Sequence, residues 1–137
     1  MRRTQNRGFT LIDVVIALAL VAILIRIALP YYSAYIVRSS RQSAQSELVN
    51  LANAQEKIYL NSSAYTTSVT GGYTGQSSGG LGVTGGKSKD SRYTYSVAAT
   101  ATTFTITATP VSGTPQANDG NLTINQSGVR TWGSKTW

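Results

Sequence analysis

The chain has 137 residues, a size typical of one domain, and a formal net charge of +7. It contains no cysteine and no histidine, and only 12% of its residues are charged. This composition excludes disulfides, cysteine nucleophiles, Ser-His triads and the usual Cys/His zinc sites. We therefore expect a protein that is not an enzyme and that holds no metal or other cofactor.

A basic leader and a long apolar run open the chain. Arg2, Arg3 and Arg7 precede a nearly unbroken apolar stretch from Phe9 to Leu29. At 1.5 Å per residue this stretch makes a helix of about 30 Å, enough to cross the hydrocarbon core of a bilayer. A secretory signal peptide has its small-residue cleavage site after the apolar core, whereas here Gly8 stands before it. We interpret the run as a membrane segment with its leader in the cytoplasm.

The border between leader and run carries a family motif. The sequence Gly8-Phe9-Thr10-Leu11-Ile12-Asp13 resembles the class III signal of type IV pilins and related pseudopilins. The resemblance implies that a prepilin peptidase cuts between Gly8 and Phe9 and then methylates the new amine of Phe9. It also implies that the apolar helix serves first as a membrane anchor and later as the core of a filament. Without the leader, nine basic residues face five acidic ones, which leaves a side-chain charge of +4.

Asp13 occupies the position at which this family nearly always has glutamate. The amine of cleaved Phe9 is a cation, and an unpaired charge inside an apolar bundle costs several kcal/mol. We expect the Asp13 carboxylate of a neighbouring subunit to neutralise it during assembly. The alternative is local, because Thr10 and Asp13 have capping-box spacing and an acid near a helix N-terminus is favourable by about 0.3–1 kcal/mol.

Two further residues, the cation Arg26 and the helix-breaking Pro30, interrupt the pattern of the apolar helix. Arg26 lies about 26 Å beyond Phe9 on a helix, so its guanidinium can snorkel to the outer membrane interface. The alternative is that Arg26 pairs in the filament with Asp13 of a neighbour displaced along the axis, or with the backbone carbonyls freed by the following proline. Pro30 lacks an amide hydrogen and crowds the carbonyl of Arg26, which predicts a helix kink at Pro30.

The pattern becomes one-sided between Ser33 and Asn61, as expected for a helix with one buried face. Its apolar stripe consists of Val37, Ala44, Leu48, Leu51, Ile58 and Tyr59, and its polar side of Ser46, Asn50, Asn53 and Lys57. We expect residues 9–61 to form one helix of about 80 Å.

The rest of the chain predicts a loop and then a sheet. Eight of the thirteen glycines lie between Gly71 and Gly86, which predicts a flexible surface connection. The family resemblance implies the alternative that this segment sets contacts between subunits or with surfaces. Alternating segments at 93–97 and 104–108 predict a hairpin, and 122–124 and 129–132 predict further strands. The expected fold is α+β, a long N-terminal helix packed on a three- to four-stranded antiparallel sheet. We divide the chain into leader peptide (1–8), transmembrane and assembly helix (9–30), amphipathic half of the same helix (31–61), connecting loop (62–91) and sheet with C-terminal loop (92–137), with 31–137 as the globular head.

The segment from Arg92 to Trp137 resembles PilE-like type IVa pilins in the run Arg92-Tyr-Thr-Tyr-Ser-Val, the run Phe-Thr-Ile-Thr-Ala-Thr-Pro, Gln116 and Asp119 before Leu-Thr-Ile, the run Ser-Gly-Val-Arg and Trp137. The resemblance thus covers nearly the whole chain and is weakest between Gly71 and Asp90. The paired cysteines of that subgroup are missing, and we expect Trp132 and Trp137 to hold the C-terminal loop on the sheet instead. The resemblance implies a structural pilus subunit, major or minor, that supports twitching motility and adhesion. Its implied partners are other pilins in a homo-oligomeric filament, the prepilin peptidase and the inner-membrane assembly machinery. Its implied location is the bacterial inner membrane as a precursor and then the extracellular pilus.

A set of basic residues suggests a second function, DNA binding. The candidate residues are Lys87, Lys89, Arg92, Arg130 and Lys135, with aromatic side chains nearby. Five scattered cations also suit a solvated rim. The alternatives to a general pilus subunit are a minor pilin that binds DNA in natural transformation and a pseudopilin of a type II secretion system.

Overall fold

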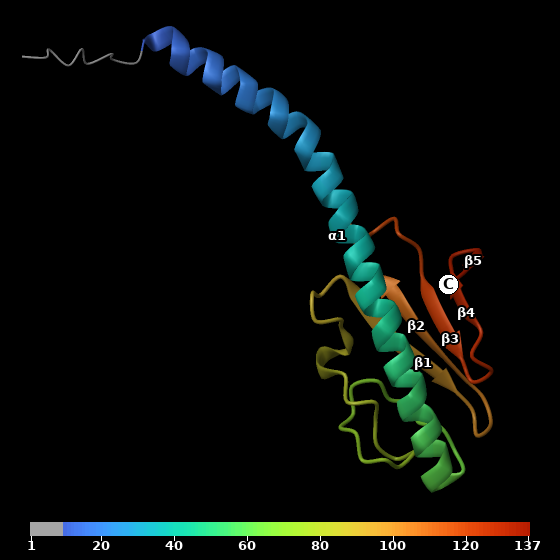
Figure 1. Cartoon of the computed structure of the whole chain (residues 1–137). Helices are drawn as coiled ribbons and strands as arrows, with labels where there is room; N and C mark the ends of the chain where they lie inside the picture. Colours follow the sequence, from blue (N-terminus) through green and yellow to red (C-terminus); the bar gives the residue numbers. More distant parts are fainter. Residues whose placement is uncertain (1–9) are drawn as a thin grey trace, which may run out of the picture. The chain divides into compact units, whose positions relative to one another are not determined.

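The computed structural model describes residues 10–137, so the predicted cleavage site at Gly8 and Phe9 and the predicted methylation of the Phe9 amine lie outside the described residues. Helix α1 (Leu11–Ser62) runs without interruption through Pro30 (Figure 1). Contacts divide the chain into two units, one up to Ile36 and one from Val37 to Trp137.

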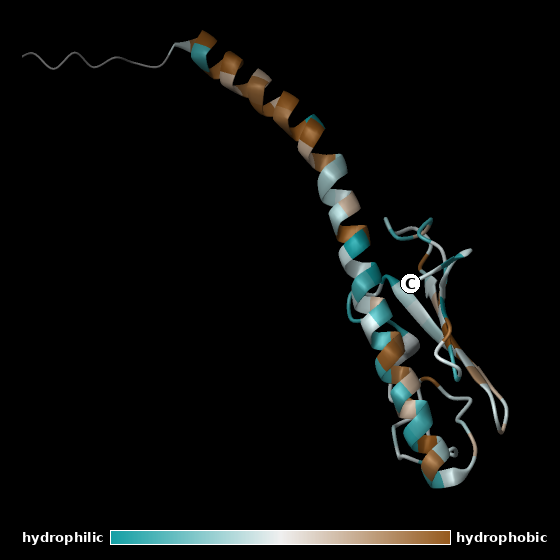
Figure 2. Ribbon diagram, turned by 45° about the vertical axis from the view of Figure 1, so that its right-hand side comes forward, coloured by the Kyte–Doolittle hydropathy of each residue, from teal (hydrophilic) through white to brown (hydrophobic). Residues whose placement is uncertain are grey.

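In the first unit, α1 is almost entirely apolar, and all its residues from Leu11 to Tyr35 are exposed (Figure 2). The helix is long and apolar enough to span a membrane. The leucine and alanine residues favour this helix, the isoleucine and valine residues are compatible with it, and neither glycine nor proline stands between Leu11 and Leu29 to end it. Its apolar side chains therefore need a covering that this unit does not supply.

The second unit contains a sheet of five antiparallel strands in the order in which they occur in the chain. The strands are β1 (Tyr93–Ala99), β2 (Phe104–Pro110), β3 (Leu122–Asn125), β4 (Arg130–Trp132) and β5 (Lys135–Thr136). The predicted α+β pilin-like class is confirmed, and the sheet has one strand more than the expected three or four. The additional strand β5 has two residues, too few for an alternating pattern to reveal it.

The alternation along the strands separates two faces of the sheet. One face packs against the C-terminal half of α1 (Figure 1), and the other presents mainly threonine to solvent. The predicted apolar stripe of α1 is confirmed, since its members are buried or half-buried whereas the predicted polar side is exposed. The core consists of Ala44, Leu48, Leu51, Ala52, Ile58, Tyr65, Val69, Leu81, Val83, Tyr93, Tyr95, Phe104, Ile106, Ala108, Leu122 and Ile124.

The connecting loop is packed, which corrects the expectation of a flexible surface connection. Gly80 and Gly82 donate backbone hydrogen bonds to the carbonyls of Gly72 and Gly71, at 3.0 and 2.9 Å. A Cβ at Gly80 would lie 2.3 Å from the carbonyl oxygen of Gly71, so the two backbones approach as closely as they do only because a side chain is missing. A short 3₁₀ helix, η1 (Thr84–Gly86), follows. The glycines thus allow close packing here.

Gln55 fastens the start of this loop to α1. Its side chain is fully buried, donates to the carbonyl of Thr66 at 2.8 Å and accepts from the amide of Thr66 at 3.0 Å. One side chain therefore satisfies both backbone groups of a buried loop residue.

We predict that Gln55→Ala lowers the free energy of unfolding by about 2–4 kcal/mol, because it leaves the donor and the acceptor of Thr66 buried without partners. Urea titration of the fragment 37–137, which contains the whole core, measures this change. Gln42→Ala, on the exposed side of α1, is the matched control and should shift stability by no more than about 0.5 kcal/mol. Equal stability of the two variants would contradict the assigned role of Gln55.

Candidate functional site

The first candidate site is the N-terminal end of α1. Asp13 Oδ2 accepts from the Thr10 amide at 3.1 Å and from the Thr10 hydroxyl at 2.7 Å. The Thr10 hydroxyl accepts in turn from the Asp13 amide at 3.4 Å. These contacts form a reciprocal cap of the kind that the spacing predicts. The cap also holds a carboxylate beside the first turn of the helix, close in sequence to the Phe9 amine.

The two other predicted residues of this segment lie apart from Asp13. Arg26 is exposed on the same helix, 13 residues or about 20 Å further along, so the two cannot pair within one chain. Pro30 lies inside the continuous helix, and its carbonyl accepts from the Ser33 hydroxyl at 2.9 Å. The kink at Pro30 and the pairing of Arg26 stay predictions.

A buried polar cluster holds the C-terminal region against α1. Arg41 donates from Nε to Asp119 Oδ2 at 2.7 Å, and its Nη2 donates to Oδ1 in a two-pronged ion pair. Tyr93 donates its hydroxyl to Asp119 Oδ2 at 2.6 Å. Asp119 therefore joins a helix, a strand and its own loop at one carboxylate whose side chain is only 4% exposed.

Gln116 completes this cluster. Its Nε2 lies 2.6 Å from Asp119 Oδ2, 2.7 Å from the Tyr93 hydroxyl and 3.2 Å from the Val37 carbonyl. The two hydrogens of the amide are shared among these acceptors, which fixes its orientation. This contact joins Val37 and Gln116, which are 79 positions apart in the sequence. A disulfide could join distant segments in the same way.

The two tryptophans add to the same region. Trp132 donates its indole N–H to the backbone carbonyl of Asp119, and the Arg41 guanidinium lies 3.7 Å from the centre of its ring. Trp137 donates to the carbonyl of Thr131 at 2.9 Å. These bonds attach β4 to the Asp119 loop and the chain end to β4.

The environment sets the protonation of the cluster. Burial acts to raise the pKa of Asp119, but hydrogen bonds from Arg41 and Tyr93 and the Arg41 charge outweigh it and lower that pKa. Burial, followed by the Asp119 carboxylate, raises the pKa of Tyr93, so its phenol stays protonated and donates. The cluster is therefore built around an ionised Asp119.

The five predicted DNA-binding cations fall into two groups at opposite edges of the sheet. In the first group, Lys87 forms an isolated backbone β-bridge with Thr94 of edge strand β1, and Lys89 lies two residues further along the chain. Arg92 Nε lies 3.9 Å from Asp90 Oδ2. Arg130 and Lys135 lie on β4 and β5, 5.2 and 5.4 Å from the ring centres of Trp137 and Trp132. The sheet order places β2 and β3 between the groups, so the five do not form one patch.

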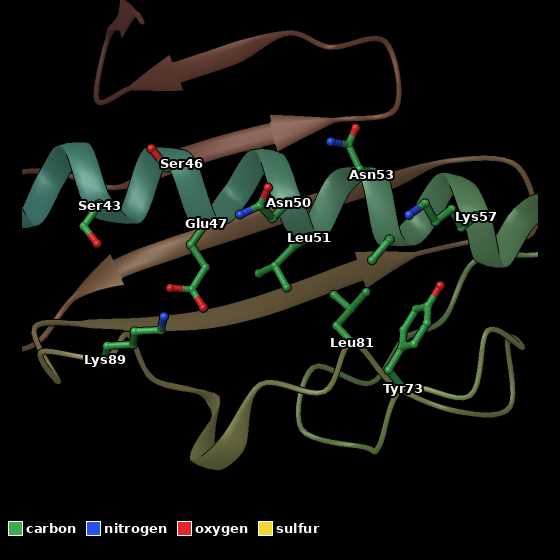
Figure 3. Close-up of a pocket in the computed structure, with 11 residues that line it drawn as sticks. Ser43, Ser46, Glu47, Asn50, Leu51, Asn53, Lys57, Tyr73, Leu81 and Lys89 are labelled. Carbon is green, nitrogen blue, oxygen red and sulfur yellow. The ribbon is translucent and has the colours of Figure 1, made fainter.

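A groove runs between α1 and the connecting loop (Figure 3) and has a cavity volume of about 630 Å³. Leu51 and Leu81 supply apolar lining, and polar side chains surround it. Lys89 lies opposite Glu47 at one end, and Tyr73 lies toward Lys57 at the other. The full lining is Ser43, Ser46, Glu47, Asn50, Leu51, Asn53, Ala54, Lys57, Tyr73, Leu81 and Lys89.

Sequence reasoning missed the groove and the Asp119 cluster for different reasons. The polar side of α1 was expected only to face solvent. In the structure it forms one wall of a groove, because the glycine-rich loop lies beside it. Asp119 and Gln116 lie in a segment without periodicity, where only the family resemblance singled them out. Arg41 is one of several cations on α1, so nothing in the sequence paired it with Asp119. Among residues 10–137 no cluster of three or more His, Cys, Asp or Glu residues could hold a metal ion.

Comparison with protein families gives two matches that together cover most of the chain. Residues 30–123 match the family described as type IV minor pilin ComP, DNA uptake sequence receptor. Residues 3–28 match the prokaryotic N-terminal methylation motif, which includes the predicted cleavage and methylation site at Gly8 and Phe9.

Individual relatives share part of the chain. The type IV major pilin protein PilA of Myxococcus xanthus is 36% identical over 62 residues, 45% of this chain and 28% of the relative. A fimbrial protein of Pseudomonas aeruginosa is 38% identical over 65 residues, 47% and 42% of the two chains. The type II secretion system core protein G of Klebsiella michiganensis is 31% identical over 71 residues, 52% and 50%. The chain thus spans half or less of the length of these relatives.

We predict that the second unit loses stability in acid through Asp119. Its pKa is lowered in the folded state, so its contribution is complete above the ordinary carboxyl pKa of about 3.9 and is lost as the pH falls through the folded value. Urea unfolding of the fragment 37–137 at pH 7, 4 and 3 should show a decline that Asp119→Asn flattens. An identical acid decline in both proteins would contradict this role.

Proposed function

The chain belongs to the type IV pilin family and, within it, to the ComP family, and on that premise we propose that it is a minor structural subunit of a type IV pilus. Pilins are structural proteins, and family membership implies assembly with other pilins and processing by a prepilin peptidase. The methylation motif and the apolar helix fit a membrane-anchored precursor that later becomes part of an extracellular pilus.

The observation that carries this proposal is the uncovered apolar half of α1. From Leu11 to Tyr35 every residue is exposed, whereas the unit from Val37 onward has a core of its own. Lipid can cover such a helix before assembly, and equivalent helices of other subunits can cover it afterwards. In the proposed filament, the heads face outward and support twitching motility and adhesion.

Asp13 is the residue proposed to guide assembly. The cap formed with Thr10 keeps the carboxylate at the end of the helix, where the Phe9 amine of an incoming neighbour would need a counter-charge inside the apolar bundle. In the same filament, Arg26 would pair with the Asp13 of a neighbour displaced along the axis. Entry into the filament would depend on the inner-membrane assembly machinery.

DNA capture is a second candidate function, favoured by the description of the matching family as a DNA uptake sequence receptor. The matched residues 30–123 include Lys87, Lys89 and Arg92 but end before Arg130 and Lys135. The latter two also lie near tryptophan rings. We therefore propose the group beside β1 as the phosphate-binding surface. A pseudopilin role, suggested by the similarity to a type II secretion core protein, would not require a DNA-binding surface.

Asp13→Ala should insert in the membrane like the parent but lower the amount of sheared surface pili at least tenfold, because the Phe9 amine then enters the bundle unpaired. Electron microscopy and immunoblots of sheared fractions measure this, and Asp13→Glu should restore assembly. Thr10→Ala is the informative control, since it removes the cap and keeps the carboxylate. If Thr10→Ala lowers assembly as much as Asp13→Ala, capping alone explains Asp13.

The full chain in detergent should retain duplex DNA at low salt, and Lys87→Gln with Lys89→Gln should weaken retention. Removing two phosphate contacts should reduce the slope of log affinity against log salt by about 1.8. The matched control, Arg130→Gln with Lys135→Gln, removes the same charge at the other sheet edge and should change the slope little. Equal effects of the two pairs would contradict a localised surface, and no retention at low salt would exclude DNA capture.

A further inference from the structure

We propose that the groove between α1 and the connecting loop binds a short stretch of single-stranded DNA and receives an unstacked base from it. The inference rests on the DNA-capture function proposed above and assigns to it an adjoining part of the surface, which shares Lys89 with the phosphate-binding group. The groove extends from Lys89, which belongs to the phosphate-binding group, to Lys57 (Figure 3).

The shape of the groove favours a single strand over a duplex. Proteins commonly read duplex DNA with an element that enters a groove of the nucleic acid, whereas this surface is itself hollow. Its cavity of about 630 Å³ lies within the roughly 300–1,000 Å³ of small-ligand sites, a size that suits part of a strand. Unpaired bases can be splayed outward and inserted, which paired bases resist.

The length of the groove suits a short run of nucleotides. Glu47, which lies opposite Lys89, and Lys57 are ten residues apart on α1, or about 15 Å along the helix axis. A stacked strand advances about 3.4 Å per nucleotide, so the distance corresponds to about four nucleotides. Lys89 and Lys57 at the two ends can each bind a phosphate of the DNA backbone. The apolar lining between them can then contact a base.

The lining offers the groups that a base requires. Tyr73 is about half exposed on the loop wall and presents a ring for stacking. Asn50 lines the groove from α1 with a carboxamide, which can donate and accept together as adenine requires, whereas Asn53 points away from the loop wall. Leu51 and Leu81 provide apolar contact for the face of a base.

Glu47 limits what binds at the Lys89 end. Its carboxylate accepts from the Tyr95 hydroxyl at 3.4 Å and would repel a phosphate. It can instead accept from an exocyclic amino group such as that of cytosine. This end therefore favours a base edge beside Glu47 with the phosphate displaced toward Lys89.

Fluorescence anisotropy with a labelled mixed-sequence eight-nucleotide strand, and with the same sequence as duplex, tests the site in the full chain in detergent. The parent should bind the single strand, and Tyr73→Ala should weaken that binding about tenfold while changing duplex binding less than twofold. Tyr73→Phe keeps the ring and should bind like the parent. Asn50→Ala should weaken adenine-containing strands more than thymine-only strands.

Charge is tested separately with matched single changes. Lys57→Gln should reduce the salt slope for the single strand by about 0.7, and Arg130→Gln should leave it unchanged. Thermal unfolding of each variant confirms that the exposed substitutions preserve the fold. If the parent binds DNA but Tyr73→Ala and Lys57→Gln bind the single strand as the parent does, the groove is not the site and DNA capture stands. If the parent binds neither form, both proposals fail.

Discussion

The apolar side chains of α1 from Leu11 to Leu29 have nothing to pack against within the described part of the chain. Burial of apolar surface is the largest favourable term in folding, so a helix that forgoes it within its own chain must obtain it elsewhere. Lipid and other copies of the helix are the two coverings that suit a rod of this length. The membrane precursor and the filament thus both cover the apolar side chains of α1, the first with lipid and the second with other copies of the helix. Both environments must also accommodate the charges of Asp13 and Arg26.

The head meets a different constraint, because its last third must be held to α1 without cysteine. The pair of Arg41 and Asp119, with Tyr93 and Gln116 around the carboxylate, joins segments far apart in sequence. Removing one partner of a buried pair typically costs about 3–5 kcal/mol, comparable with the loss of a disulfide from a small domain. Unlike a disulfide, this closure does not depend on redox conditions and weakens in acid.

The sequence predicted the elements with strong local patterns and missed the contacts between distant ones. The apolar run, the stripe through Leu48 and Leu51 and the alternating strands each follow from one period, so the α+β fold was predictable. The packed loop was not, because glycine signals both flexibility and close backbone approach, and only the tertiary structure shows which applies at Gly80. Likewise, Lys87 and Arg130 were grouped as basic residues, but strand order separates them. The packing of the connecting loop beside α1 places Lys57 and Lys89 along a common groove instead.

The central claim is that α1 is released at its amino end and then covered by copies of itself. Intact-mass and N-terminal fragment spectra of the protein taken from sheared surface filaments test this most directly. The account predicts a chain that begins at Phe9 with one methyl group on its amine. A filament subunit that begins at another residue, or a processed chain found only in the membrane fraction, would contradict it.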